Sequence, residues 1–250
     1  MSEETKITTV SDLIAEVGRL QDHYGVLNLW FRGQRQTTWD LVPSVFRDGH
    51  ESQERNYTHR FRSRAKTRYA GAPAYGDFAL WLSLMQHYAL PTRLLDWSRS
   101  PLVAAYFAIE AYLYGDAAEV DAAIWVLQPH GLNGFEIGSD VTPGIEAGMI
   151  QNFIDPAFLE ESEEPNGIVA AMASEHDLRM FVQQGCFTIH SDRTALNKRE
   201  RSERWLTKLV ITADAIRSFS NELQICGLRK GDIYPDLEHL AHELKVLKGI

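Results

Sequence analysis

The sequence predicts a single α+β domain. Segments with helical periodicity and segments typical of strands are mixed, and they lack the regular spacing of a doubly wound fold. The length of 250 residues and mass of 28.4 kDa suit one domain. With 44% hydrophobic and 24% charged residues, the composition excludes a mainly disordered chain. We expect one domain over residues 1–250, with an N-terminal helix within 1–24.

The first half of the chain should begin with a helix over 11–23. Ser11 can cap this helix, and its apolar residues share one face. A strand-like run over 26–31 then ends at Arg32-Gly33, where Gly33 can adopt a turn conformation closed to other residues.

Three further helices are expected before residue 115. The first is polar and basic, over 53–70, and the second is more apolar, over 76–89. Pro91 keeps the residue before it out of helical geometry, so the second helix ends there. Ser100 followed by Pro101 predicts the start of a third helix, which should reach about Tyr114. Its nearly unbroken apolar content indicates burial.

The second half mixes loops, strands and helices. Loops and short elements are expected over 130–165, and a short helix over 168–173. The expected strands are 123–127, 186–190 and 206–211, and the last helices are 213–223 and 236–247.

The chain carries a net charge of −9, from 25 basic and 34 acidic residues. Overall charge therefore does not predict a nucleic-acid-binding protein. One segment is an exception, because it holds six basic residues and no acidic one: Arg55, Arg60, Arg62, Arg64, Lys66 and Arg68. This segment is either a solvated helix face, a patch that attracts an anionic ligand, or a site for single-stranded nucleic acid. Tyr57, Phe61 and Tyr69 would supply the aromatic rings for the last of these.

No apolar run approaches the length of about 20 residues that a membrane span needs. The polar, acidic start lacks the features of a signal peptide, so we expect a cytoplasmic protein with no membrane partner. Cys186 and Cys226 are too few for a disulfide framework or a Cys-rich zinc site, and we expect no metal.

Several polar residues lie among bulky apolar ones, where a buried charge must be paired or hydrogen-bonded. These residues are Arg32, Gln86 with His87, Thr92 with Arg93 and Asp96, and Arg179 with Gln184. Arg93 and Asp96 either pair to fix a turn or bind a ligand. Arg32 suits a phosphate, because its guanidinium offers two parallel donors and Gly33 would let a ligand approach the backbone.

The order of these motifs resembles the FRG-domain family over about residues 25–245. The family's name-giving triplet corresponds to Phe31-Arg32-Gly33, and its most specific block to Pro91-Thr92-Arg93-Leu94-Leu95-Asp96-Trp97. Two later blocks correspond to Arg179 with Gln183–Thr188, and to Tyr234–Leu237. This sequence departs from the family at Ala89, where glycine is expected, and at Ser98, where threonine is expected.

A more distant resemblance is to the ADP-ribosyltransferase fold, which implies split, mixed or antiparallel sheets with flanking helices and NAD as the substrate. In that fold Arg32 and Gly33 would hold NAD, and Thr92 or Ser98 would supply the hydroxyl of the second strand. Gln184 would occupy the third-strand position near the nicotinamide ribose, where a glutamate is usual; Glu175, Asp177 or Asp96 could compensate.

The resemblance therefore implies Arg32, His87 and Gln184 as catalytic residues, with His87 as acid or base. It implies NAD contacts from Arg32, Gly33, Thr92, Arg93, Asp96 and Ser98.

The resulting functional hypothesis is an NAD-dependent ADP-ribosyltransferase or NAD glycohydrolase. Such an enzyme could serve as a bacterial toxin or anti-phage effector, with a protein or nucleic acid as acceptor. One alternative is a module that binds a nucleotide or nucleic acid without turnover. Another is a protein-interaction domain in which Arg32, Arg93 and Asp96 form a structural polar network.

Overall fold

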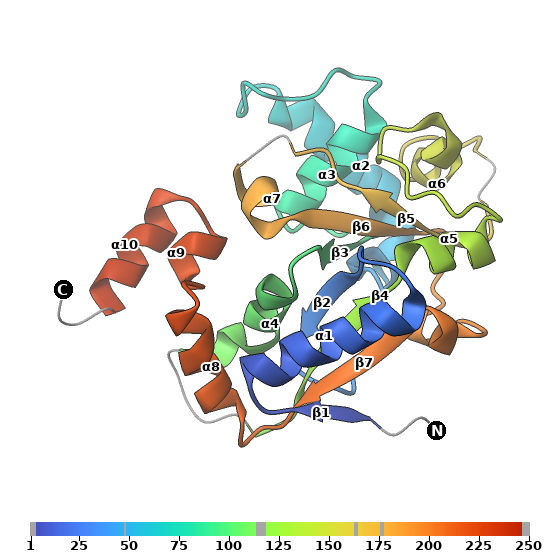
Figure 1. Ribbon diagram of the computed structural model, residues 1–250. Helices are drawn as coiled ribbons and strands as arrows, with labels where there is room; N and C mark the ends of the chain where they lie inside the picture. Colours follow the sequence, from blue (N-terminus) through green and yellow to red (C-terminus); the bar gives the residue numbers. More distant parts are fainter. Residues whose placement is uncertain (1–3, 48, 114–118, 163–164, 176–177, 247–250) are drawn as a thin grey trace.

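Seven strands form one mixed sheet in the order β1-β7-β4-β2-β3-β6-β5 within the described part of the computed structural model (Figure 1). The structure describes residues 4–47, 49–113, 119–162, 165–175 and 178–246. The strands are β1 Thr5–Ile7, β2 Trp30–Gln34, β3 Leu94–Ser98, β4 Ala122–Leu127, β5 Ile168–Met172, β6 Gly185–His190 and β7 Leu206–Ile211. Only the pairing of β1 with β7 is parallel, and the other neighbours are antiparallel.

The sheet is nearly divided between β2 and β3. A single register pair, Phe31 with Ser98, joins these two strands, whereas β2 and β4 share five pairs. The predicted mixture of strands and helices in one domain is therefore confirmed, but the prediction of separate sheets is wrong. The two halves diverge on either side of one point of contact.

Helices cover both halves of the sheet on the same face. Over β1, β7, β4 and β2 lie α1 Val10–Tyr24, α4 Pro101–Ile109 and α8 Ile216–Ile225. Over β3, β6 and β5 lie α2 Glu54–Ala65, α3 Phe78–His87 and α6 Gln151–Ile154. A third apolar cluster, which includes Trp30 and Trp97, fills the opposite face beneath both halves and contacts α5 Pro129–Glu136. The remaining helices are α7 Leu178–Gln183, α9 Lys230–Ile233 and α10 Leu237–Val246.

Local sequence signals place several element ends correctly. Ser100 caps α4 by accepting a hydrogen bond from the Val103 amide, and Pro101 fills the first turn. The α4 helix stops at Ile109 and continues as a 3₁₀ turn, Glu110–Tyr112; Tyr114 lies outside the described residues. The first helix is also present, but its cap is Thr9 rather than Ser11. Thr9 and Asp12 form a reciprocal capping box there.

The sequence misses or misassigns three strands. Residues 168–173 contain β5 instead of the predicted helix, and periodicity assigned no strand to β1 or β3. β5 is covered on both faces, because Val169 packs into one apolar cluster and Ala170 into another. A strand buried on both faces loses the alternation that would distinguish it from a buried helix.

Gly33 is needed for close packing rather than for a turn. It lies within β2 and is not among the residues with positive φ, so the predicted turn conformation is wrong. A Cβ at this position would lie 2.0 Å from the Ala104 carbonyl oxygen and 2.4 Å from the Ala108 amide nitrogen. The absent side chain therefore allows α4 to pack closely against β2, and Gly33 also lines the cleft described below.

Ala89 has a φ of 57°, in the left-handed region that favours glycine. Glycine would adopt this backbone geometry without the steric cost that alanine carries. Across the described residues, no helix combines the length and apolar character required to cross a bilayer.

Candidate functional site

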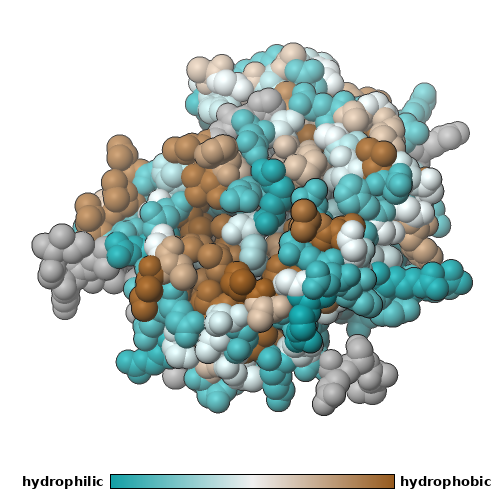
Figure 2. Space-filling view, in the orientation of Figure 1, coloured by the Kyte–Doolittle hydropathy of each residue, from teal (hydrophilic) through white to brown (hydrophobic). Residues whose placement is uncertain are grey.

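A cleft of about 1130 Å³ opens where β2 and β3 diverge. Its walls come from β2, β3, the segment 35–47, α3, α4 and α7, with Lys230 at the start of α9. In the orientation of Figure 1, Figure 2 shows hydrophobic side chains gathering over α4 and α8 and also over α7 and α10. The cleft thus lies at the junction of the two halves of the sheet.

Arg32 is placed in this cleft by β2. Its Nη1 donates to the main-chain carbonyl of Asp96 at 2.6 Å and lies 4.0 Å from the Asp96 carboxylate. Its Nε is buried and has no hydrogen-bond partner among the described residues. Burial lowers the pKa of Arg32 from its usual value, and Asp96 opposes this shift while Arg47 adds to it. The guanidinium therefore retains one unsatisfied donor, and the side chain, which is 20% exposed, lines the cleft.

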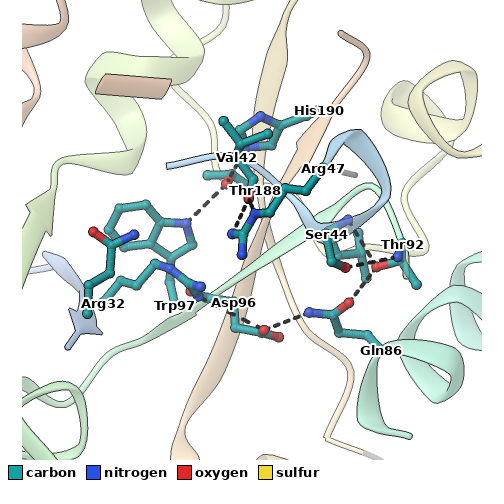
Figure 3. A network of polar contacts seen from close by, with 12 residues as sticks. Arg32, Val42, Ser44, Arg47, Gln86, Thr92, Asp96, Trp97, Thr188 and His190 are labelled. Atoms are coloured by element: carbon teal, nitrogen blue, oxygen red, sulfur yellow. Dashed lines mark hydrogen bonds and ion pairs between the residues drawn. The ribbon is translucent and has the colours of Figure 1, made fainter. Parts of the chain in front are cut away.

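Asp96 is held in place by a chain of hydrogen bonds. The Gln86 amide nitrogen donates to the Asp96 carboxylate at 2.6 Å, and the Thr92 hydroxyl donates to the Gln86 carbonyl oxygen. Figure 3 shows Asp96 between Arg32 and Gln86. The side chain of Asp96 remains 56% exposed, so its carboxylate is both fixed and accessible to a ligand.

The lining of the cleft is positive although the whole chain is negative. It contains six cations and three carboxylates. The cations are Arg32, Arg35, Arg47, Arg179, Arg193 and Lys230, and the carboxylates are Asp40, Asp96 and Glu110. Charge of one sign in a cleft raises the local concentration of ligands of the opposite sign. This composition favours an anionic ligand.

Two other predicted residues line the same cleft. His87 does so from the end of α3, and its ring makes an edge contact with Tyr88 at a centroid distance of 4.9 Å. Ser98 lines the cleft from β3, but its hydroxyl already donates to the Gln183 carbonyl at 2.7 Å and accepts from the Ser100 amide. Of the two hydroxyls left open by the sequence, Ser98 thus faces the cleft.

Thr92 and Arg93 do not line the cleft, which corrects the expectation that they contact a ligand. Thr92 is completely buried and orients Gln86. Arg93 is 2% exposed and forms two parallel hydrogen bonds with Glu54, at 3.1 and 2.7 Å; it also donates to the Phe153 carbonyl. The predicted pairing of Arg93 with Asp96 is also wrong.

Gln184 does not line the cleft either. It is exposed and adopts a left-handed φ of 49°, and the next residue begins β6. The preceding Gln183 lines the cleft instead and donates to the Ile233 carbonyl at 3.1 Å. Glu175 is paired with Arg99 at 2.7 Å, and Asp177 lies outside the described residues. Of the two expected substitutes that the structure describes, Asp96 lines the cleft and Glu175 does not.

Sequence analysis missed Arg47, Glu110 and Lys230 as cleft residues. Arg47 lies in an irregular segment, where its Nε donates to the Val42 carbonyl at 2.7 Å. The Glu110 carboxylate accepts a hydrogen bond from the hydroxyl of Tyr234, which lies 124 residues later in the sequence. Local pattern does not mark these positions, because their place in the cleft depends on contacts between segments far apart in the sequence.

A buried polar row lies behind the cleft wall. The indole nitrogen of Trp97 donates to the Thr188 hydroxyl, which contacts His190 Nε2; both distances are 3.0 Å. His190 is completely buried. Burial, together with the nearby charges of Arg199 and Arg32, lowers the pKa of His190 to about 3. This histidine is therefore neutral at physiological pH and behaves as part of the core.

Comparison with known families identifies one segment. Residues 27–116 match the FRG domain. This FRG segment runs from just before β2 to beyond α4, so it contains Arg32, Gln86, His87 and Asp96. The two later blocks, around Gln183–Thr188 and Tyr234–Leu237, lie outside it, and the expected extension to residue 245 stays a prediction. No curated protein and no solved structure matches the chain.

Proposed function

We propose that the cleft binds NAD and that the protein cleaves its nicotinamide–ribose bond, transferring ADP-ribose to an acceptor or to water. The observation that carries this proposal is Arg32, whose buried Nε has an unused donor beside the fixed carboxylate of Asp96. A guanidinium suits a pyrophosphate, and a nearby carboxylate suits a developing cation.

The volume and charge of the cleft support the same ligand. A volume of about 1130 Å³ slightly exceeds the usual range of small-molecule sites, as a dinucleotide requires. Six lining cations attract the two phosphates, and the apolar lining around Phe107 can contact a base or nicotinamide ring.

The reaction separates the bond between the ribose C1′ and the nicotinamide nitrogen. Nicotinamide departs as a neutral molecule with the electron pair of that bond, and positive charge develops on the ribose. The Asp96 carboxylate stabilises this charge. A nucleophilic oxygen or nitrogen of the acceptor then bonds to C1′, and His87 accepts the proton that the nucleophile loses.

The first experiment is a nicotinamide-release assay with purified protein and NAD, with and without cell lysate as a source of acceptors. The wild type should release nicotinamide, and Arg32→Ala and Asp96→Asn should reduce the rate by at least about 100-fold, as for the loss of a group that stabilises the transition state. Arg217→Ala, at an exposed arginine of α8, is the matched control and should retain the rate.

Two other results would overturn the proposal. Binding of NAD by calorimetry without nicotinamide release would favour a nucleotide-binding module. The position of Gln184 outside the cleft favours this alternative, because no third-strand side chain then reaches the ribose. No binding, together with unfolding of Arg32→Ala, would favour a structural network in a protein-interaction domain. A cytoplasmic role in toxicity or anti-phage defence stays a prediction.

A further inference from the structure

The helix α2 carries a row of exposed cations. Arg60, Arg64 and Arg68 follow one another at intervals of four residues along α2 and the turn after it, and Arg55 and Lys66 are also exposed. Within the described residues, none of these five side chains has a carboxylate partner. We call these five residues the basic row.

The basic row is unfavourable for the helix itself. Like charges four residues apart repel one another and destabilise a helix. The chain has 34 acidic residues that could have relieved this repulsion, yet none lies between residues 55 and 68. An ordinary solvated helix face mixes charges of both signs. Because the row has no carboxylate partner among the described residues, it points to an anionic partner.

Arg62 belongs to the same segment but has a different role. It is 4% exposed, and its guanidinium lies over the Tyr75 ring at 3.8 Å and donates to the Tyr75 carbonyl. The Tyr75 side chain itself remains 65% exposed. Arg62 thus fixes an accessible aromatic ring beside the basic row, and Lys66 Nζ lies 5.9 Å from the same ring.

A second exposed ring connects the basic row to the cleft. Tyr88 is 57% exposed and follows α3 directly. It contacts Phe61 of α2 at a centroid distance of 6.4 Å and His87 of the cleft at 4.9 Å. The surface that joins the basic row to the cleft therefore carries fixed aromatic rings, and α2 and α3 lie together at the top of Figure 1.

We propose that single-stranded nucleic acid binds along this surface, with phosphates on Arg60, Arg64 and Arg68 and unpaired bases stacked on Tyr75 and Tyr88. Exposed rings beside cations favour a single strand, because base faces are accessible there and hidden in a duplex. This surface goes beyond the proposed function, since binding does not require NAD. A strand bound there would reach the rim of the cleft at His87.

The test measures binding of fluorescein-labelled oligonucleotides of about 15 nucleotides to the full chain, without NAD, across a range of salt concentrations. Single-stranded DNA or RNA should bind, and a duplex of the same sequence should bind more weakly. The variant Arg60→Gln/Arg64→Gln/Arg68→Gln should reduce the slope of log affinity against log salt by about 2, at about 0.7 per lost phosphate contact.

A matched variant, Arg201→Gln/Arg204→Gln/Arg217→Gln, makes the same change in charge at three exposed arginines elsewhere. It should leave the slope unchanged. Tyr88→Leu should weaken binding about tenfold with little change in slope, because stacking depends weakly on salt. The basic-row variant should keep its melting temperature, since glutamine suits a helix and removes the repulsion.

Four results would overturn the proposal. Single strands could fail to bind at low salt, both triple variants could weaken binding equally, or the duplex could bind as tightly as the single strand. Equal loss in the two triple variants would show that binding is not localised to the basic row. Preference for anionic lipid vesicles, measured in parallel, would assign the basic row to a membrane surface. None of these outcomes depends on nicotinamide release.

Discussion

Arg32 and Arg93 lie in two regions of the same FRG segment and differ in how their donors are used. Arg93 is buried between β3, α2 and α6. It forms a bidentate ion pair with Glu54 and also donates a hydrogen bond to the Phe153 carbonyl. Arg32, where β2 and β3 diverge, makes one hydrogen bond to a main-chain carbonyl and keeps a buried donor unused. Arg93 therefore behaves as part of the core, whereas Arg32 is available to a ligand.

An arginine in apolar surroundings can thus be structural or ligand-binding, and the partners of its donors distinguish the two roles. Both side chains must offset the cost of leaving water. Arg93 does so with a partner of its own chain. Arg32 does so only in part, beside a cleft of positive lining. Loss of Arg93 should therefore lower the free energy of unfolding much more than loss of Arg32.

The largest loss is expected for Arg93→Met. This change leaves the Glu54 carboxylate buried without its cation, which should lower the free energy of unfolding by about 3–5 kcal/mol in urea denaturation. The double variant Arg93→Met/Glu54→Leu should recover much of this loss, because no unpaired charge remains. A loss under about 1 kcal/mol for Arg93→Met would show that the pair is not structural and would remove the contrast with Arg32.

Gly33→Ala tests the packing next to Arg32. The new methyl would overlap the α4 backbone at Ala104, so β2 and α4 must separate, at a cost of about 1–3 kcal/mol in thermal or urea unfolding. Gly18→Ala is the control, because a Cβ at this position in α1 meets nothing within 4 Å. It should stabilise the protein by about 0.5–1 kcal/mol. Equal behaviour of the two variants would contradict the packing role of Gly33.

His190 links the two regions, because its amide donates to the Arg93 carbonyl and the charge of Arg32 affects its ring. Its folded pKa of about 3 lies below the unfolded value of 6.5, so the unfolded state binds the proton first as pH falls. Stability should therefore fall from about pH 6.5 downward, with about 2 kcal/mol lost at pH 5.

The difference in stability between wild type and His190→Asn isolates this contribution, because carboxylates titrate in both proteins. Urea denaturation at several pH values should show a smaller loss on acidification in the variant. Parallel curves for the two proteins would mean that His190 is protonated equally in the folded and unfolded states.

Arg32→Ala should have the smallest effect on stability, under about 1 kcal/mol, because it removes one hydrogen bond and a partly desolvated charge. The same variant is expected to reduce nicotinamide release by at least about 100-fold. If this variant melted at a temperature as low as that of Arg93→Met, Arg32 would be a structural residue like Arg93, and the proposed difference between the two arginines would be wrong.

Much of the fold was predictable where the sequence carries a local signal. The capped start of α4 at Ser100-Pro101 and the strands β4 and β7 follow from residue type and short-range pattern. The prediction for residues 168–173 was wrong, because a strand covered on both faces shows no alternation. Gly33 was interpreted as a turn residue, because the sequence gives no sign of a helix packed against it.

Residue type and local context were enough to indicate which polar residues would need partners. It singled out Arg32, Gln86, Arg93 and Asp96, since polar groups among bulky apolar neighbours must be satisfied on burial. Only the tertiary structure decided which partners they have. Glu54 lies 39 residues before Arg93, and Asp96 lies 64 residues after Arg32. Contacts between residues so far apart in sequence depend on how helices and strands pack in space, and local periodicity does not predict that packing.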